Sequence, residues 1–151
     1  RVELSGSGDV DISQITADEL ELEIDGSGNM VVTGALEVFN TCQLQIDGSG
    51  NLSVEYLAAQ TTELLIDGSG DIRIEGDTQH AHVEIDGSGD VHAFDLDTET
   101  ADVFVNGSGN TELTVFNHLF VDISGSGNVC YRGNPTIETD IDGSGNLINK
   151  N

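Results

Sequence analysis

The chain has 151 residues, of which 28 are Asp or Glu and only four are Lys or Arg, so its formal net charge is −24. This length fits a single domain, 1–151, and the charge repels nucleic acids and anionic membrane surfaces, which favours cationic, neutral or cation-bridged partners. No apolar run approaches the roughly 18 residues that a membrane-spanning segment needs, so membrane insertion is not expected.

The chain opens with Val2-Glu3-Leu4, which already has the alternating pattern of a strand, so we expect that further residues preceded Arg1. A Gly-Ser-Gly motif followed by Asp or Asn then recurs eight times, at intervals of 18 to 22 residues. Repetition at a near-fixed period indicates a solenoid, in which each repeat stacks on its neighbours. The first glycines of the motifs are Gly6, Gly26, Gly48, Gly68, Gly87, Gly107, Gly125 and Gly143.

Apolar or small residues stand two, four and six positions before the first glycine of the motif, which we expect to form a corner of the chain. Leu20, Leu22 and Ile24 before Gly26 are an example. The same phase resumes after the corner, as in Ile72 and Ile74, and the intervening residues are mostly polar. This period of two predicts half-buried strands with one inward face. The residues expected to form one stacked inward column are Ile24, Ile46, Ile66, Ile85, Val105, Ile123 and Ile141.

Each repeat therefore predicts a strand, a Gly-Ser-Gly corner with both glycines pointing inward, a second strand and a looser polar return such as 58–61 or 95–98. About 20 residues are too few for a βαβ unit, which needs roughly 30, or for a propeller blade, which needs about 40. We predict an all-β, right-handed parallel β-helix of about eight coils. An antiparallel meander or a propeller is the alternative.

The two cysteines, Cys42 and Cys130, lie four to five repeats apart. At about 4.8 Å for each stacked strand their separation is roughly 20 Å, which exceeds the roughly 7 Å Cα limit of a disulfide. Both are expected to be free.

Near its end the chain carries Tyr131-Arg132-Gly133-Asn134-Pro135, followed by a last corner at 142–145. Together with the repeated Asp-Gly-Ser-Gly corners, this element resembles the "putative auto-transporter adhesin" family with the head GIN domain. The resemblance covers essentially the whole chain. The chain departs from the family in lacking the expected leading strands and in being more acidic and poorer in lysine.

The resemblance implies a β-helical protein of Bacteroidetes and related bacteria, made behind a secretion or lipoprotein signal. It implies an extracellular, cell-surface or periplasmic location and brings no catalytic residues with it. We therefore expect a non-enzymatic adhesin head that contacts another protein or a glycan surface.

The sharpest candidate site lies in the fourth and fifth repeats, where Asp flanks the corner on both sides. The four carboxylates of Asp67, Asp71, Asp86 and Asp90 supply the hard oxygen ligands that Ca²⁺ prefers. The alternative is that they accept backbone hydrogen bonds at the corners. His80, His82 and His92 lie on outward positions nearby, where a surface role is favoured over a transition-metal site. No other cofactor is expected.

Two competing functions remain open. Because the terminal segments continue the ordinary repeat, and Arg132 and Lys150 lie near one end, the chain is also a candidate subunit of an end-to-end filament or oligomer. A carbohydrate-binding or polysaccharide-degrading β-helix is the third class. It is disfavoured because Trp is absent, and Tyr56 and Tyr131 lie in separate repeats, so an aromatic platform is not expected.

Overall fold

The computed structural model describes residues 1–151 as twelve β-strands, and it contains no helix that would cross a membrane. All strand pairs are parallel. The strands are β1 (Val2–Gly6), β2 (Asp9–Ile12), β3 (Ile15–Ala17), β4 (Leu20–Gly26), β5 (Asn29–Gly48), β6 (Asn51–Gly68), β7 (Asp71–Gly87), β8 (Val91–Gly107), β9 (Thr111–Gly125), β10 (Asn128–Arg132), β11 (Thr136–Gly143) and β12 (Asn146–Asn149).

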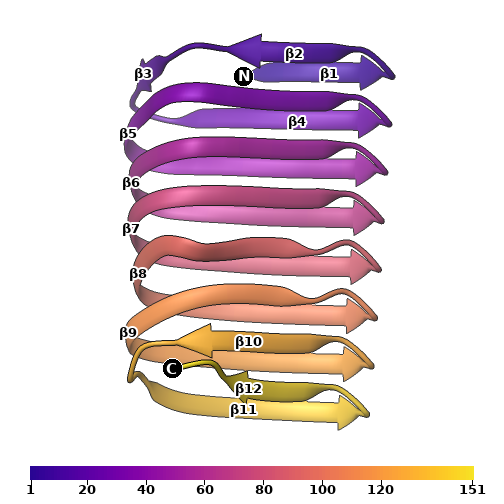
Figure 1. Ribbon diagram of the computed structural model, residues 1–151, viewed down its shortest axis with the longest axis vertical. Helices are drawn as coiled ribbons and strands as arrows, with labels where there is room; N and C mark the ends of the chain where they lie inside the picture. Colours follow the sequence, from indigo (N-terminus) through magenta and orange to yellow (C-terminus); the bar gives the residue numbers. More distant parts are fainter.

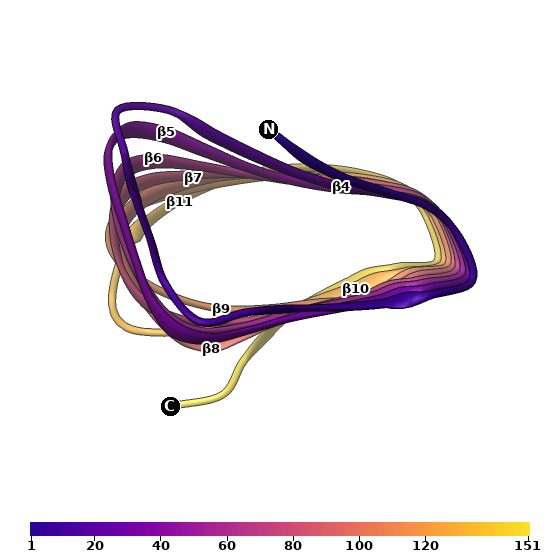
Figure 2. The ribbon, with the colours of Figure 1, turned by 90° about the horizontal axis from the view of Figure 1, so that it is seen from above.

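The strands stack into one coil whose axis runs from the N-terminal to the C-terminal repeat (Figure 1). Seen from the N-terminal end, the chain runs clockwise as it moves away from the viewer, so the coil is right-handed (Figure 2). The eight Gly-Ser-Gly corners are separated by seven intervals, which gives about seven turns. The predicted parallel β-helix is confirmed.

The return of each coil differs from the prediction, because it is part of the sheet and not a loose polar loop. Each strand from β5 to β9 runs without a break from one corner to the next, and Figure 2 shows the return as a short third side. Leu57 and Leu96 point inward on this side, and both are buried. Register shifts, such as the one between Val54 and Leu57, let the chain bend there while the ladder continues.

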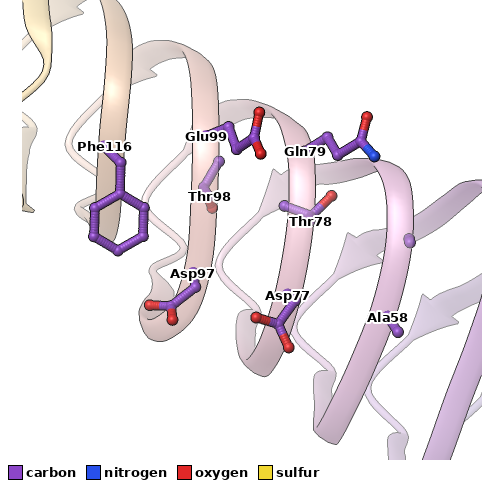
Figure 3. A pocket seen from close by; sticks show the side chains of 9 residues that line it. Ala58, Asp77, Thr78, Gln79, Asp97, Thr98, Glu99 and Phe116 are labelled. Atoms are coloured by element: carbon purple, nitrogen blue, oxygen red, sulfur yellow. The ribbon is translucent and has the colours of Figure 1, made fainter.

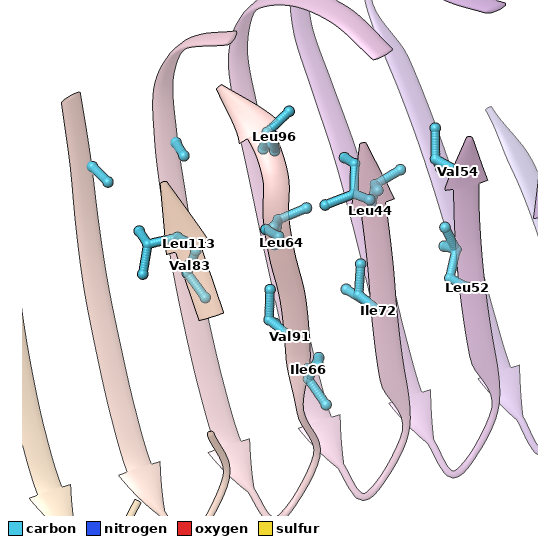
Figure 4. Packing of buried hydrophobic residues seen from close by; sticks show 14 of the residues in the cluster. Leu44, Leu52, Val54, Leu64, Ile66, Ile72, Val83, Val91, Leu96 and Leu113 are labelled. Atoms are coloured by element: carbon cyan, nitrogen blue, oxygen red, sulfur yellow. The ribbon is translucent and has the colours of Figure 1, made fainter. Parts of the chain in front are cut away.

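The core fills the inside of the coil, where 33 buried residues form a single cluster (Figure 4). The predicted inward column pairs in register, for example Ile46 with Ile66 and Ile66 with Ile85. Burial of each such side chain is worth about 1.5–3 kcal/mol. Ile141 is the exception at 39% exposure, because β11 has a neighbouring coil on one side only.

The corners require glycine at both positions, for two different reasons. Gly68 has a φ of +129°, and a Cβ there would lie 2.3 Å from the carbonyl oxygen of Gly48 in the preceding coil. A Cβ on Gly70 would lie 2.2 Å from the oxygen of Gly50 and 2.7 Å from Cγ2 of Ile46. The second glycine thus faces the core as predicted, whereas the first faces the neighbouring backbone. Side chains would force the coils apart at this corner.

Candidate functional site

The return side of the coil carries the candidate site. Its inward residues Val38, Ala59, Thr78, Thr98 and Val115 are register partners. The residues that follow Ala59, Thr78 and Thr98 form one outward column, because the register continues between their strands. The register shifts directly after Val38 and directly after Thr98, so the residues that follow Val38 and Val115 flank this column at its two ends. A second outward column consists of Glu37, Ala58, Asp77 and Asp97. We call this surface the return edge, and its first column is Gln60, Gln79 and Glu99, flanked by Phe39 and Phe116.

Large aromatic side chains are exposed on the return edge. Phe39 is 60% exposed, Phe116 is 49% exposed, and Tyr56 beside Phe39 is also 49% exposed. Phe39 and Phe116 stand at the two ends of the outward column, with two glutamines and one glutamate between them. Four steps of about 4.8 Å place the two phenylalanines roughly 19 Å apart along the axis. None of the three aromatic residues contributes to the buried core.

Two open hollows adjoin each other along this edge. One, of ≈ 410 Å³, is mainly apolar and includes Phe39 and Tyr56 in its wall. The other, of ≈ 400 Å³, is lined by polar residues and ends at Phe116 (Figure 3). Both are lined by Ala58 and Ala59, so they form one continuous groove.

The floor of the groove is fixed by hydrogen bonds inside the protein. Thr62 donates to Oγ1 of the buried Thr78 at 2.9 Å, and Thr98 donates to the carbonyl oxygen of Leu96 at 3.3 Å. These threonine hydroxyls are therefore already engaged. Figure 3 shows Gln79 and Glu99 side by side on successive coils, and Asp77 and Asp97 side by side on the other flank of Thr78 and Thr98. The return edge therefore presents hydrogen-bonding side chains between two exposed phenylalanine rings, above a floor that internal hydrogen bonds hold in place.

The predicted calcium residues are divided between two ladders on either side of the corner. Oδ1 of Asp71 accepts a hydrogen bond from the backbone N–H of Asp90 at 3.1 Å, and Oδ1 of Asp90 accepts one from the N–H of Asn110 at 2.8 Å. Asp67 and Asp86 line a separate hollow on the other side. No three His, Cys, Asp or Glu side chains come close enough to hold a metal ion together. Calcium at these residues stays a prediction.

The predicted histidines lie on the outer surface, each near a carboxylate. Nε2 of His80 is 3.5 Å from Oδ2 of Asp102, and Nδ1 of His92 is 2.9 Å from Oε2 of Glu112. His82 lies against the ring of Phe104. The three imidazoles are thus part of an outer polar and aromatic surface.

The aromatic residues exposed on the return edge are mainly phenylalanines, whereas the sequence expectation rests on Tyr and Trp alone. Tyr131 is in fact largely buried, and its hydroxyl accepts a hydrogen bond from Asn149 at 3.1 Å. Tyr56, by contrast, is exposed and lines the same hollow as Phe39. The exposed phenylalanines of the return edge are aromatic groups that the expectation based on Trp and Tyr did not include. The sequence alone carries no signal that marks Phe39 and Phe116 as outward, because register shifts interrupt the alternation on this side.

Comparison with known proteins identifies the family. Residues 38–135 match the sequence profile of the family described as "Putative auto-transporter adhesin, head GIN domain". The chain belongs to this family. The resemblance given by the corners and the Tyr131–Pro135 element is thereby confirmed. No curated protein matches the chain in sequence.

Solved structures with the same fold include two that are described as adhesins and one that is described as lipid-binding. A "putative adhesin" from Parabacteroides distasonis has 29% identity, a TM-score of 0.94 and 98% coverage of this chain. A "putative adhesin" from Parabacteroides merdae has 25% identity, a TM-score of 0.96 and 99% coverage. A "putative lipid binding protein" from Parabacteroides distasonis has 28% identity, a TM-score of 0.92 and 99% coverage.

The chain is shorter than the proteins that it resembles. It spans 63%, 63% and 61% of these three chains, in the same order. The head GIN domain family and these structures are described as adhesins or as lipid-binding, and none is described as an enzyme.

Proposed function

We propose that this chain is a non-enzymatic adhesion domain that acts outside the cytoplasm, at the cell surface or in the periplasm, and binds a glycan chain along its return edge. The observation that carries the proposal is the column with exposed Phe39 at one end, exposed Phe116 at the other, and Gln60, Gln79 and Glu99 between them. Membership of an adhesin family supports a role in surface contact.

The chemistry of the return edge suits a sugar chain. Aromatic rings bury the apolar faces of pyranose rings, while amide and carboxylate oxygens accept hydrogen bonds from sugar hydroxyls. The groove is open along its length, so it favours binding of an extended polymer over a reaction that needs exclusion of water. The net charge of −24 favours a neutral or cationic glycan over an anionic one.

A glycan array followed by calorimetry tests the proposal. We expect the wild type to bind a neutral or amino-sugar oligosaccharide, and Phe39→Ala or Phe116→Ala to weaken that binding about tenfold, as loss of an aromatic anchor does. Both variants should keep the wild-type melting temperature, because the two side chains are exposed.

Ile137→Ala is the matched control, because Ile137 is also an exposed apolar residue, at 43%, but lies on β11 away from the groove. It should bind the same oligosaccharide as tightly as the wild type. Because one similar structure is named a "putative lipid binding protein", neutral phosphatidylcholine vesicles form a second arm. A blank array, or Phe39 and Phe116 variants that bind as the wild type does, overturns the proposal.

Self-association through the ends of the β-helix is the second candidate, and it stays a prediction from the sequence. Light scattering over a range of concentrations tests it: growing, elongated particles support self-association, and a concentration-independent monomer rules it out.

A further inference from the structure

A second group of aromatic side chains lies on the strands that precede the Gly-Ser-Gly corners, away from the return edge. The rings of His82 and Phe104 have centroids 5.4 Å apart, and those of Phe104 and Phe120 are 5.6 Å apart. The three rings come from three successive coils, in β7, β8 and β9, and form a zigzag that we call the aromatic row. All three side chains are half-buried, so part of each ring faces solvent.

Carboxylates flank the central ring of the aromatic row on both sides. Glu84 pairs in register with Phe104, and Phe104 pairs with Asp122, so one acid lies about 4.8 Å away along the ladder in each direction. A hollow of ≈ 290 Å³ opens beside the ring, and its wall includes Glu84, Asp86, Phe104 and Asp122. The hollow therefore combines an aromatic surface with three acidic side chains.

No cationic side chain of this protein neutralises these acids. The ion pairs of Arg1 are with Glu3, Glu21 and Glu23, and Arg73 pairs with Glu75. Glu84 has only the imidazole of His82, at 3.8 Å.

Elsewhere in this protein an arginine already stacks on a phenylalanine ring. At another position, the guanidinium carbon of Arg132 lies 4.1 Å above the centre of the Phe94 ring. A guanidinium stacks on an aromatic face and forms paired hydrogen bonds with carboxylates, which a lysine ammonium does less well. Phe104 has the carboxylates for such a contact but has no internal arginine.

We propose that the hollow beside Phe104 is a docking site for an arginine side chain of a basic segment in a partner protein. The guanidinium stacks on the Phe104 ring and pairs with the carboxylates of Glu84 and Asp122. The site is separate from the return edge and does not depend on glycan binding.

Fluorescence anisotropy with a labelled Gly-Arg repeat peptide, at pH 8 and low salt, tests the site. We expect Phe104→Leu to weaken binding about fivefold, which corresponds to the loss of one cation–π contact while apolar cover is kept. Asp122→Asn should also weaken binding, and the matching Gly-Lys peptide should bind less tightly than the Gly-Arg peptide.

Asp11→Asn is the matched control for charge, because Asp11 is an exposed acid on β2 and its loss changes the net charge equally. It should leave peptide binding unchanged, as should Phe116→Ala on the return edge. The proposal is overturned if Phe104→Leu binds the Gly-Arg peptide as the wild type does, or if Asp11→Asn weakens binding as much as Asp122→Asn. Either result shows attraction to overall charge only.

Discussion

At the scale of single residues, the phase of the alternation decides whether a side chain faces the interior. The number of neighbouring coils decides how completely that side chain is buried. Ile66 and Ile141 stand at the same place before a corner, yet Ile66 is 2% exposed and Ile141 is 39% exposed. The difference follows from their neighbours, since Ile66 has a stacked coil on both sides and Ile141 on one. The same substitution at these two positions therefore has different consequences.

We expect Ile66→Asp to destabilise the protein by about 4 kcal/mol or more, because it places an unpaired charge in the apolar interior. Ile141→Asp should cost less than about 1 kcal/mol, because water reaches that position. Thermal melts of both variants beside the wild type measure the difference. Equal melting temperatures for the two variants would mean that the inward column is wrongly assigned.

The two cysteines should differ in reactivity. Burial raises the pKa of the Cys42 thiol from 9.0 to about 12, whereas Cys130 is partly exposed. Because the thiolate is the reactive form, iodoacetamide at pH 8 should label Cys130 alone in the native protein and both residues after denaturation. Mass spectrometry of the labelled chain measures this, and rapid native labelling of Cys42 would contradict its burial.

The raised pKa also predicts a loss of stability at high pH. The unfolded thiol ionises above about pH 9, while the native thiol stays protonated up to about pH 12. The contribution of Cys42 to stability is therefore complete below pH 9 and falls as the pH rises through that window. A Cys42→Ala variant should lack this part of the pH dependence.

At the scale of elements, the side chains that follow the corners form a hydrogen-bonded ladder. Nδ2 of Asn29 donates to Oδ1 of Asp9 at 2.8 Å, and Nδ2 of Asn51 donates to Oδ1 of Asn29 at 3.0 Å. Further along, Asn110, Asn128 and Asn146 continue the same pattern. An aspartate has no amide to donate, so the ladder lacks the side-chain bonds that residues 71 and 90 would otherwise donate to the preceding coil, although Oδ1 of Asp90 accepts one from Nδ2 of Asn110 at 2.9 Å.

We expect the double variant Asp71→Asn/Asp90→Asn to melt about 4 °C above the wild type. It adds two amide donors, each worth about 1 kcal/mol, and removes the repulsion between neighbouring carboxylates. Replacement of both residues by alanine is the control and should lower the melting temperature, because the backbone N–H groups of Asp90 and Asn110 lose their acceptors. A double asparagine variant that melts below the wild type would contradict the stabilising effect of the side-chain ladder.

The same variant tests the calcium prediction. If Asp67, Asp71, Asp86 and Asp90 hold Ca²⁺, millimolar calcium should raise the melting temperature of the wild type above its value in chelator. The Asp71→Asn/Asp90→Asn variant should lose this response, because half of the carboxylates become neutral amides. A wild-type melt that is the same in calcium and in chelator rejects the site and leaves these residues in their hydrogen-bonding role.

The sequence was sufficient for the strands beside the corners, where residues such as Ile46 and Val54 keep a strict period of two. It was not sufficient for the return side, because register shifts near Val54 and Ala93 interrupt the alternation there. A residue of the return therefore cannot be assigned inward or outward by counting from a corner. Leu96 was expected in a loose loop for this reason, and it is buried.

At the scale of the whole molecule, the β-helix is a scaffold that converts distant residues into continuous columns. Phe39 and Phe116 flank the same outward column because the residues before them, Val38 and Val115, belong to one series of register partners with Ala59, Thr78 and Thr98. The repeats between Phe39 and Phe116 differ in length, so the position of one phenylalanine relative to the other depends on every register shift between β5 and β9. The fold class was predictable from local spacing, whereas the candidate site required the complete register.

The most direct measurement is a map of backbone amide NMR shifts during titration with the oligosaccharide that binds best on the array. Binding along the return edge predicts shifts confined to residues 37–39, 56–60, 77–79, 97–99 and 114–117, which disappear in a Phe39→Ala/Phe116→Ala variant. Shifts centred on the aromatic row or on the Gly-Ser-Gly corners, or no shifts at a concentration that saturates the array signal, would contradict the return edge as the adhesive surface.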